Sequence, residues 1–364
     1  MRRPVLDADA PRAYPQGMRA AVLVSGLVLV SSCTDARQGN VPSTEPTAVP
    51  SSSSSSSSSS GSSGASGSSS SGQSETDAAG GPTPLRFIVV GDVGKGNAGQ
   101  KKVAAAMVQF CASRGCDFVW FLGDNIYPSG ISSVDDAQMK TKFEDIYGPL
   151  NLDVFAVLGN HDYGANGLGT DFARGAHEVN YSAKSAHWKM PAAHYRLTKG
   201  PVEFFGLDTN LVMFGRDDDQ RAVVPKWVAE STSEWKIAVA HHPYLSNGPH
   251  GNAGDYDDGI VPTPPPVNGA SVKSFYESTV CGKVDLLLTG HDHSRQWLTD
   301  TCKGTVLAVS GAGAEGTELK GKNPTRFQSN KLGFLYLSIL GKKLDAEFVD
   351  DNGTSDFTYS YSKP

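Results

Sequence analysis

The chain has 364 residues, with 32 Lys and Arg against 38 Asp and Glu, and its formal net charge is -6 at pH 7. This balance and the lack of a basic cluster in the sequence argue against nucleic acid as the main partner. The part of the chain from about Pro84 onward is long enough to bury one large hydrophobic core.

The first 33 residues have the pattern of a bacterial export signal. Ala20–Val30 is an apolar run of 11 residues, whereas a membrane-spanning helix needs roughly 20, so the run is typical of the central part of a signal peptide. Small residues stand directly before Cys33 and resemble a lipobox, in which the cysteine is lipidated. We predict an exported cell-envelope lipoprotein, in the outer membrane or facing the periplasm, held at the membrane only by a lipid on Cys33. An ordinary secretory signal with a secreted product is the alternative.

Residues 34–83 are of low complexity, and every residue of Ser51–Ser60 is serine. Such a segment has too little apolar surface to offset its chain entropy. We predict a disordered Ser/Gly-rich linker there, followed by one folded domain over residues 84–364.

Four cysteines follow the linker, at Cys111, Cys116, Cys281 and Cys302. An even number of cysteines in an exported chain favours two disulfides, and four cysteines allow three connectivities. We favour Cys111–Cys116 and Cys281–Cys302, because each pair is closest in sequence. None of them has the CxxC spacing of a zinc knuckle.

Apolar runs alternate with segments of helical spacing after the linker, which predicts a layered α/β core. Helices are predicted at Lys101–Ala112 and Asp135–Tyr147. Strands are predicted at Leu85–Val90, Phe118–Leu122, Val154–Leu158, Val202–Leu207, Lys236–Ala240, Val284–Thr289, Thr305–Ser310 and Phe334–Ile339. Asn247–Gly269 is rich in Gly, Pro and Asp and is predicted to be a surface loop near the functional site.

Polar side chains of metal-ligand type come directly after five of the predicted strands. They are Asp92, Asp124, Asn160, His241 and the run His291-Asp292-His293. A single Asp after a strand is usually a turn former, but five such sites in order are hard to explain by turns. Open α/β sheets bind ligands outside the carboxyl ends of their strands, so we expect these side chains to meet there.

This set of residues suits a pair of metal ions. Two cations a few ångströms apart need a shared anion, and Asp124 is the candidate. His291 and His293 are two residues apart and can reach neighbouring ions, and imidazole suits iron, zinc or manganese. Tyr127 has an ordinary pKa near 10 and would ionise only beside a strongly acidic cation such as ferric iron.

The motifs GDVG, GDNIY, GNHD, VAHHP and GHDH together resemble those of calcineurin-like metallophosphoesterases. Tyr127 in GDNIY resembles the purple acid phosphatases, and the chain is most similar to their small tartrate-resistant, mammalian-like type, here in a bacterial lipoprotein form. Further similarity lies in Gly206–Thr209, in the segment from Tyr181 to Leu197, and in Ser310–Gly313. The resemblance extends from about Arg86 to Tyr361.

The resemblance implies a fold and a set of roles. The implied fold is a four-layer α/β/β/α metallophosphoesterase sandwich, with two mixed sheets flanked by helices, over residues 84–364. The implied ligands of a ferric ion are Asp92, Asp124, Tyr127 and His293. Those of a divalent ion (Fe²⁺, Zn²⁺ or Mn²⁺) are Asp124, Asn160, His241 and His291. The histidines implied to hold the phosphate and protonate the leaving group are His161 and His250, and Asp162 is implied to orient His161.

The implied activity is that of a metal-dependent acid phosphatase, which hydrolyses phosphate monoesters with a metal-bound hydroxide as nucleophile. We expect a monomer that acts on small phosphorylated substrates. The alternatives are a phosphodiesterase or nucleotide hydrolase on the same site, and a binding lipoprotein on an inactive enzyme fold. Gly94 stands where the usual diesterases carry a histidine, and the filled ligand positions argue against an inactive fold.

The sequence departs from the resemblance in two places. The stretch Asp208–Trp227 is shorter than in the mammalian enzymes, where an exposed loop there represses activity. The Pro-rich loop Ile260–Gly269 is similar to an insertion near the site. These two departures leave regulation by a loop and substrate preference open.

Overall fold

The protein is described from a computed structural model, which covers residues 83–257 and 266–363. The predicted signal peptide, lipobox and linker lie outside the described residues. No helix in the described part of the chain is long and apolar enough to cross a membrane.

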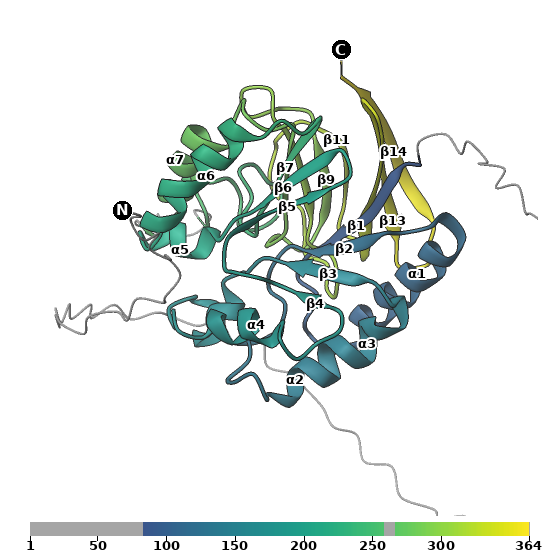
Figure 1. Ribbon diagram of the computed structural model, residues 1–364, viewed down its shortest axis with the longest axis vertical. Helices are drawn as coiled ribbons and strands as arrows, with labels where there is room; N and C mark the ends of the chain where they lie inside the picture. The colour runs from purple at the N-terminus through teal and green to yellow at the C-terminus, as the bar shows by residue number, and fades with distance from the viewer. Residues whose placement is uncertain (1–82, 258–265, 364) are drawn as a thin grey trace, which may run out of the picture. The chain divides into compact units, whose positions relative to one another are not determined.

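The strands form two mixed sheets of seven strands each (Figure 1). In the first sheet, β1 to β4 are parallel and β12 to β14 continue antiparallel. Its strands, in spatial order, are β14 (Ser355–Ser362), β13 (Lys343–Asp350), β12 (Gly333–Leu340), β1 (Leu85–Val90), β2 (Phe118–Phe121), β3 (Asp153–Ala156) and β4 (Trp188–Lys189).

The second sheet has four parallel neighbours, β6, β7, β8 and β10, with antiparallel strands at its edges. Its strands, in spatial order, are β11 (Thr325–Ser329), β9 (Arg295–Leu298), β10 (Val306–Ser310), β8 (Leu286–Thr289), β7 (Trp235–Val239), β6 (Val202–Gly206) and β5 (Tyr195–Lys199).

Helices lie on the outer side of each sheet (Figure 1). Those beside the first sheet are α1 (Ala98–Arg114), α2 (Ala137–Met139) and α3 (Asp145–Tyr147), and those beside the second are α5 (Thr209–Met213), α6 (Asp218–Glu230) and α7 (Ala270–Thr279). The short helix α4 (Gly175–Tyr181) follows the turns at residues 161–167. The prediction of two mixed sheets flanked by helices is confirmed.

Aromatic side chains join the two sheets. The Phe204 ring of β6 lies 5.2 Å from the ring of Phe87 in β1 and 5.7 Å from the ring of Phe118 in β2. On the other face of β2, Phe121 packs against Tyr147 of α3, with ring centroids 4.9 Å apart. Because β2 is buried on both faces, its sequence is a continuous apolar run, as predicted.

The predicted helix over Asp135–Tyr147 is only partly correct. The structure divides it into α2, a π-helical turn over Lys140–Glu144, and α3. Within the π turn, the Phe143 side chain is buried and packs edge-on against Phe121. The helical periodicity is therefore interrupted, but the apolar face still covers the sheet.

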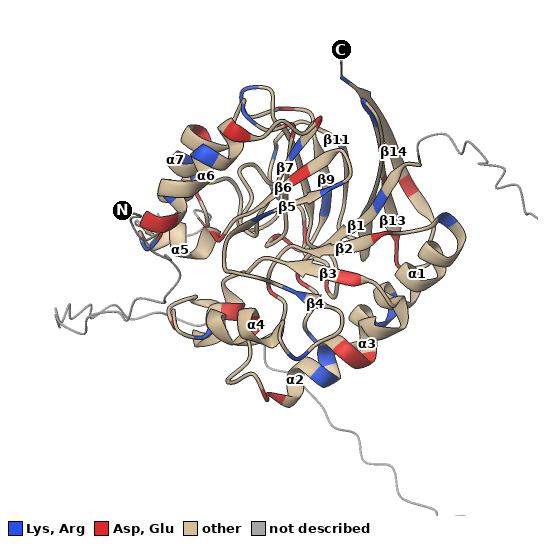
Figure 2. Ribbon diagram, viewed as in Figure 1, with Lys and Arg blue, Asp and Glu red and all other residues tan. Residues whose placement is uncertain are grey.

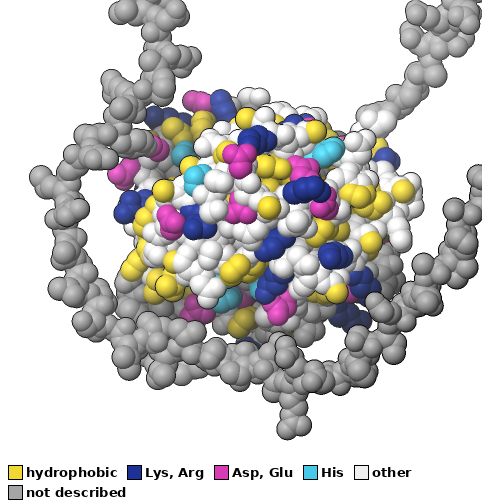
Figure 3. All heavy atoms as spheres, turned by 90° about the horizontal axis from the view of Figure 1, so that it is seen from below, with side chains coloured by type: hydrophobic (Ala, Val, Ile, Leu, Met, Phe, Trp, Pro, Cys, Tyr) yellow, Lys and Arg dark blue, Asp and Glu magenta, His cyan; other side chains and the backbone are white. Residues whose placement is uncertain are grey.

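Both predicted disulfides are confirmed. Cys111–Cys116 closes the C-terminal end of α1, and Cys281–Cys302 joins the segment after α7 to the bridge before β10. Lys and Arg are mixed with Asp and Glu over the helices, and both signs are interspersed on the face shown in Figure 3 (Figures 2 and 3).

Candidate metal centre

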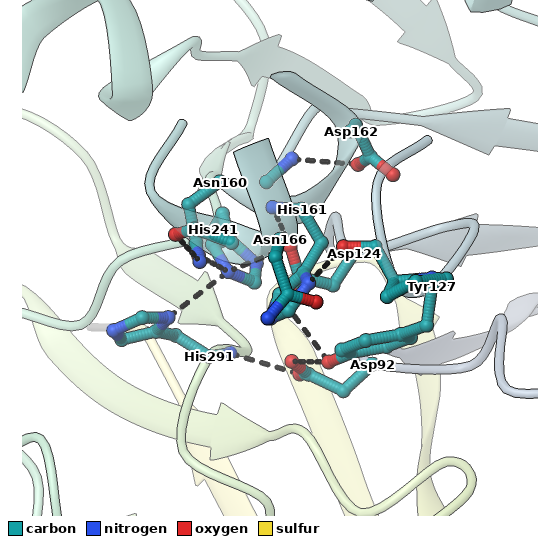
Figure 4. A network of polar contacts seen from close by, with 12 residues as sticks. Asp92, Asp124, Tyr127, Asn160, His161, Asp162, Asn166, His241 and His291 are labelled. Carbon is teal, nitrogen blue, oxygen red and sulfur yellow. Dashed lines mark hydrogen bonds and ion pairs between the residues drawn. The ribbon is translucent and has the colours of Figure 1, made fainter. Parts of the chain in front are cut away.

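The carboxyl ends of five strands, three from the first sheet and two from the second, meet at one place. Asp92, Asp124 and Asn160 follow the parallel neighbours β1, β2 and β3. His241 and His291 follow the parallel neighbours β7 and β8. Figure 4 shows these side chains pointing toward one another, so the two sheets each supply part of a single site.

One cluster of ligand-type atoms surrounds the Tyr127 hydroxyl. Its oxygen lies 2.9 Å from Asp124 Oδ2, 3.1 Å from Asp92 Oδ1 and 3.1 Å from His293 Nε2. His293 Nε2 is also 3.5 Å from Asp92 Oδ1. These four side chains are the ones assigned to the ferric ion from the sequence.

A second cluster surrounds His241 Nε2. This nitrogen lies 2.9 Å from Asn160 Oδ1, 3.1 Å from His291 Nδ1 and 3.4 Å from Asp124 Oδ1. Asp124 therefore takes part in both clusters, with Oδ2 facing Tyr127 and Oδ1 facing His241, which is the arrangement a bridging carboxylate requires. The neighbouring His242 lies close enough to His241 and His291 to form a group with them, but its Nδ1 lies 2.8 Å from Thr209 Oγ1.

These donor sets fit metal cations. Asp92 and Asp124 are 0% and 2% exposed, and among the described residues their only ion-pair partners are histidines. Burying two neighbouring carboxylates costs hydration, and at Asp124 the charges of His241 and His161 and the hydrogen bonds from His161 N and Tyr127 outweigh this cost and lower the pKa. Cations among these oxygen and nitrogen atoms would remove that cost, and the carboxylate, phenol and imidazole mixture suits iron, zinc or manganese.

The backbone around the clusters is unusual. Eight non-glycine residues in the described part of the chain have positive φ, and three are candidate ligands: Asp92 at 59°, Asp124 at 53° and His291 at 70°. Left-handed backbone at non-glycine residues is unfavourable and is concentrated at functional sites. The fold thus holds these three side chains in place at a cost to the backbone.

Gly94, which stands where the usual diesterases carry a histidine, is packed tightly against a neighbouring loop. A Cβ at this position would lie 1.8 Å from the carbonyl oxygen of Asn125, so no side chain fits there. The Gly94 carbonyl also accepts a hydrogen bond from Tyr127 N at 3.0 Å. Glycine therefore lets the loop that carries Tyr127 approach the first strand end closely.

The two histidines assigned to substrate lie beside the clusters. The His161 ring packs on the Tyr127 ring at 4.3 Å, and its Nδ1 is 2.7 Å from the carbonyl oxygen of Pro128. If Nδ1 donates to that carbonyl, Nε2 faces Asp124, from which it is 4.0 Å away. The His250 ring packs on His291 at 4.1 Å.

Asp257 holds His250, a pairing that no sequence pattern indicated. His250 Nδ1 lies 2.7 Å from Asp257 Oδ1. Burial lowers the pKa of His250, but the hydrogen bond to Asp257 and the charges of Asp292 and Asp257 outweigh this and raise the pKa to about 9. Asp257 is seven residues away in a loop with no motif, so only the folded structure pairs it with His250.

Lys95 and Glu315 also lie at the site, although no sequence pattern placed them there. Glu315 forms an ion pair with Lys95, and its Oε2 lies 3.7 Å from His293 Nδ1. The Lys95 ammonium lies 4.8 Å from the centre of the Tyr127 ring. Lys95 belongs to the Gly-Lys-Gly sequence after the first strand, which lacks the spacing of a phosphate-binding loop, and its place at the site appears only in the fold.

Together these residues line an open cavity of about 570 Å³. Its walls include Lys95, Asp124, Tyr127, Asn160, His161, His250, His291 and His293. A concave site with convergent polar groups is the expected form of a small-molecule site.

The comparison with protein families agrees with this geometry. The sequence model of the calcineurin-like phosphoesterases matches residues 85–295, more than half of the chain. The chain belongs to the calcineurin-like phosphoesterase family.

Curated relatives align with this phosphoesterase over most of its sequence. It is 29% identical over 327 residues to tartrate-resistant acid phosphatase type 5 of Sus scrofa, with 78% of this chain and 89% of the relative aligned. It is 28% identical over 310 residues to purple acid phosphatase 7 of Arabidopsis thaliana, with 77% and 86% aligned.

Solved structures share the fold. GAP50, the anchor in the inner membrane complex of Plasmodium, superposes with a TM-score of 0.61 at 20% identity, covering 77% of this chain and 89% of that one. PhoD superposes with a TM-score of 0.53 at 14% identity, covering 77% and 70%.

The prediction that Asp162 orients His161 is wrong for this phosphoesterase. The Asp162 carboxylate accepts hydrogen bonds from the backbone N–H groups of Asn125, Ile126 and Gly159, at 2.8, 3.1 and 2.8 Å. The carbonyl of Pro128 contacts His161 instead. Asp162 is fully buried and shapes the loops that carry Asn160 and Tyr127.

A second buried carboxyl lies behind Asp162. Asn125 Nδ2 donates to Asp162 Oδ2 at 3.1 Å and to Glu178 Oε2 at 3.0 Å, so one amide bridges the two acids. Burial is the main cause that raises the pKa of Glu178, from 4.5 to about 7. Burial, with the charges of Glu178 and Asp124, also raises the pKa of Asp162.

We predict that Glu178 makes the folded protein less stable as the pH rises through 7. Its folded pKa lies above its unfolded pKa, so the stability gained from its proton is complete below about pH 4.5 and is lost as the pH passes about 7. Glu178→Gln should remove this loss, on the order of 3 kcal/mol, in denaturation curves recorded from about pH 5 to about pH 8. The exposed Glu230→Gln is the control, and an unchanged pH dependence in Glu178→Gln would contradict the prediction.

Proposed function

We propose that this phosphoesterase is an acid phosphatase of the purple type, which hydrolyses small phosphate monoesters. One observation carries the proposal: the Tyr127 hydroxyl lies within 3.1 Å of both Asp92 and Asp124. Burial and the two carboxylates raise the pKa of this phenol well above its ordinary value, so it would ionise only with a strongly acidic cation beside it. The acid phosphatases among the curated relatives support the same activity.

The residues proposed to hold the ions form two sets, and Asp124 belongs to both. Asp92, Tyr127 and His293 would hold a ferric ion together with Asp124, and Asn160, His241 and His291 would hold a divalent ion (Fe²⁺, Zn²⁺ or Mn²⁺) together with it. When bound, such ions neutralise phosphoryl oxygens and lower the pKa of water. The protein contributes rigid ligands on strand ends and the backbone N–H groups of His161 and His291, which donate to Asp124 and Asp92 and hold the carboxylates in position.

His161 and His250 would act on the substrate itself. Both line the cavity beside the ligand-type residues. With Nδ1 donating to Pro128, His161 presents Nε2 to a phosphate ester. His250, held by Asp257, can carry a proton there. Either imidazole could therefore bind a phosphoryl oxygen and give a proton to the leaving oxygen.

The N-terminal segments complete the proposal. Residues 1–33 would act as a signal peptide with a lipobox, residues 34–83 as a flexible linker, and Cys33 as the only attachment to a membrane. The apolar run before Cys33 motivates this assignment. Cys33→Ser should abolish labelling by a radioactive fatty acid and release the protein into a fraction without membranes, and wild-type protein that is already unlabelled would refute the anchor.

The Tyr127 assignment predicts a colour. Phenolate-to-iron charge transfer absorbs visible light, so the protein reconstituted with iron in air should be purple. Tyr127→Phe should lose the visible band while retaining most of the iron through Asp92, Asp124 and His293. Tyr181→Phe, a change of the same kind away from the site, should stay purple. A colourless wild-type protein with full phosphatase activity and two zinc or manganese ions would contradict the purple type and leave the family intact.

The His161 assignment predicts a dependence on the leaving group. His161→Ala should keep both metals but lower kcat by roughly 10²–10⁴ on an ester with a poor leaving group. The loss should be smaller on an activated aryl phosphate, because that leaving group needs less help from a proton. His187→Ala serves as the control and should leave kcat unchanged. Equal losses on both esters would show that His161 is not the proton donor.

A further inference from the structure

A second cavity opens beside the metal centre. This side pocket has a volume of about 250 Å³ and shares Asn160, Gly167, Leu168, His250 and His291 with the larger cavity. Its remaining walls are Asn210, Met213, His242, Tyr256, Asp257 and Val267. A molecule bound at the candidate metal ligands can therefore extend into the side pocket past His250 and Leu168.

Exposed apolar side chains are concentrated at the side pocket. Among the described residues, the large hydrophobic side chains that are exposed are Leu168 at 66%, Val267 at 38% and Leu340 at 44%. Leu168 and Val267 both line the side pocket, and Leu340 lines neither cavity. Apolar surface at the edge of a polar site is stabilised when a ligand covers it.

The backbone that presents Leu168 is fixed. The Gly167 carbonyl accepts a hydrogen bond from Asn160 Nδ2 at 2.8 Å, and the Gly169 carbonyl accepts one from Asn210 Nδ2 at 2.9 Å. Just before them, Ala165 and Asn166 have positive φ values of 52° and 53°. Strain of this kind persists where the surrounding structure imposes it, often at ligand sites. The fold therefore holds Leu168 in its exposed position. One of the hydrogen bonds that does so comes from Asn160, a candidate metal ligand.

Asn210 lies in the wall of the side pocket and carries a buried, unpaired oxygen. Its side chain is 0% exposed, and its Oδ1 has no hydrogen-bond partner. Burying an unpaired acceptor costs about 1–3 kcal/mol, and such atoms often mark a missing partner. Asn210 therefore acts on the side pocket by holding the Gly169 backbone, next to Leu168.

We propose that the side pocket binds the alcohol part of the substrate, and that the enzyme prefers phosphate monoesters whose alcohol is a bulky apolar or aromatic group. This inference rests on the proposed phosphatase function. A cavity of about 150 Å³ accommodates benzene in a protein core, and the side pocket is larger. With the phosphoryl group at the metal ligands, an aromatic ring would lie against Leu168, Met213 and Val267, next to His250.

The test compares two esters on the metal-loaded full-length protein. Phenyl phosphate and 2-naphthyl phosphate have leaving groups of similar acidity but different apolar size, so the chemical step changes little between them. Wild type should favour 2-naphthyl phosphate by about tenfold in kcat/KM. Leu168→Ser should reduce this preference to about twofold or less, mainly through KM, with unchanged metal content. Leu168→Met should restore the preference.

Leu340→Ser is the matched control, because it makes the same change at an exposed leucine outside both cavities. It should retain the wild-type preference. Equal kcat/KM for the two esters in wild type, or an unchanged preference in Leu168→Ser, would overturn the inference while the phosphatase function stands. Failure of the metal-loaded wild type to hydrolyse either ester would overturn the proposed function and this inference with it.

Discussion

The structure depends on keeping two carboxylates side by side in its interior. Asp92 and Asp124 are almost completely buried, and the Tyr127 hydroxyl lies between them. Burial of like charges costs hydration and adds repulsion, and at Asp124 the charges of His241 and His161 outweigh the cost of burial and lower its pKa. Bound cations would stabilise the carboxylates further, and metal binding would then contribute to folding stability as well as to catalysis.

In the two-sheet fold, both sheets contribute residues to the candidate metal centre. The first sheet supplies the candidate oxygen ligands after β1, β2 and β3, and the second supplies the candidate imidazole ligands after β7 and β8. The aromatic core between the sheets, centred on Phe204, fixes the distance between the two sets of strand ends. Positive φ at Asp92, Asp124 and His291 then turns each side chain toward the shared space.

Sequence patterns predicted the buried parallel strands and the ligand-type residues at their ends, because burial on both faces leaves continuous apolar runs. They missed edge strands such as β5 and β14, whose side chains alternate between half-buried and exposed. The family resemblance also implied that Asp162 orients His161, whereas the chain turns Asp162 toward the backbone of Asn125. Asp257 and Leu168 reach the site through loop geometry that no spacing rule encodes.

Metal stoichiometry shows whether one carboxylate, that of Asp124, joins two metal ions. Metal analysis of the purified protein should give two ions per chain in wild type. Asp124→Ala removes a ligand from both ions, so both should be lost together with phosphatase activity. Asn160→Ala removes a ligand from the divalent ion alone and should leave about one ion, mainly iron. One ion per chain in wild type, or two ions retained in Asp124→Ala, would show that Asp124 does not bridge a pair of ions.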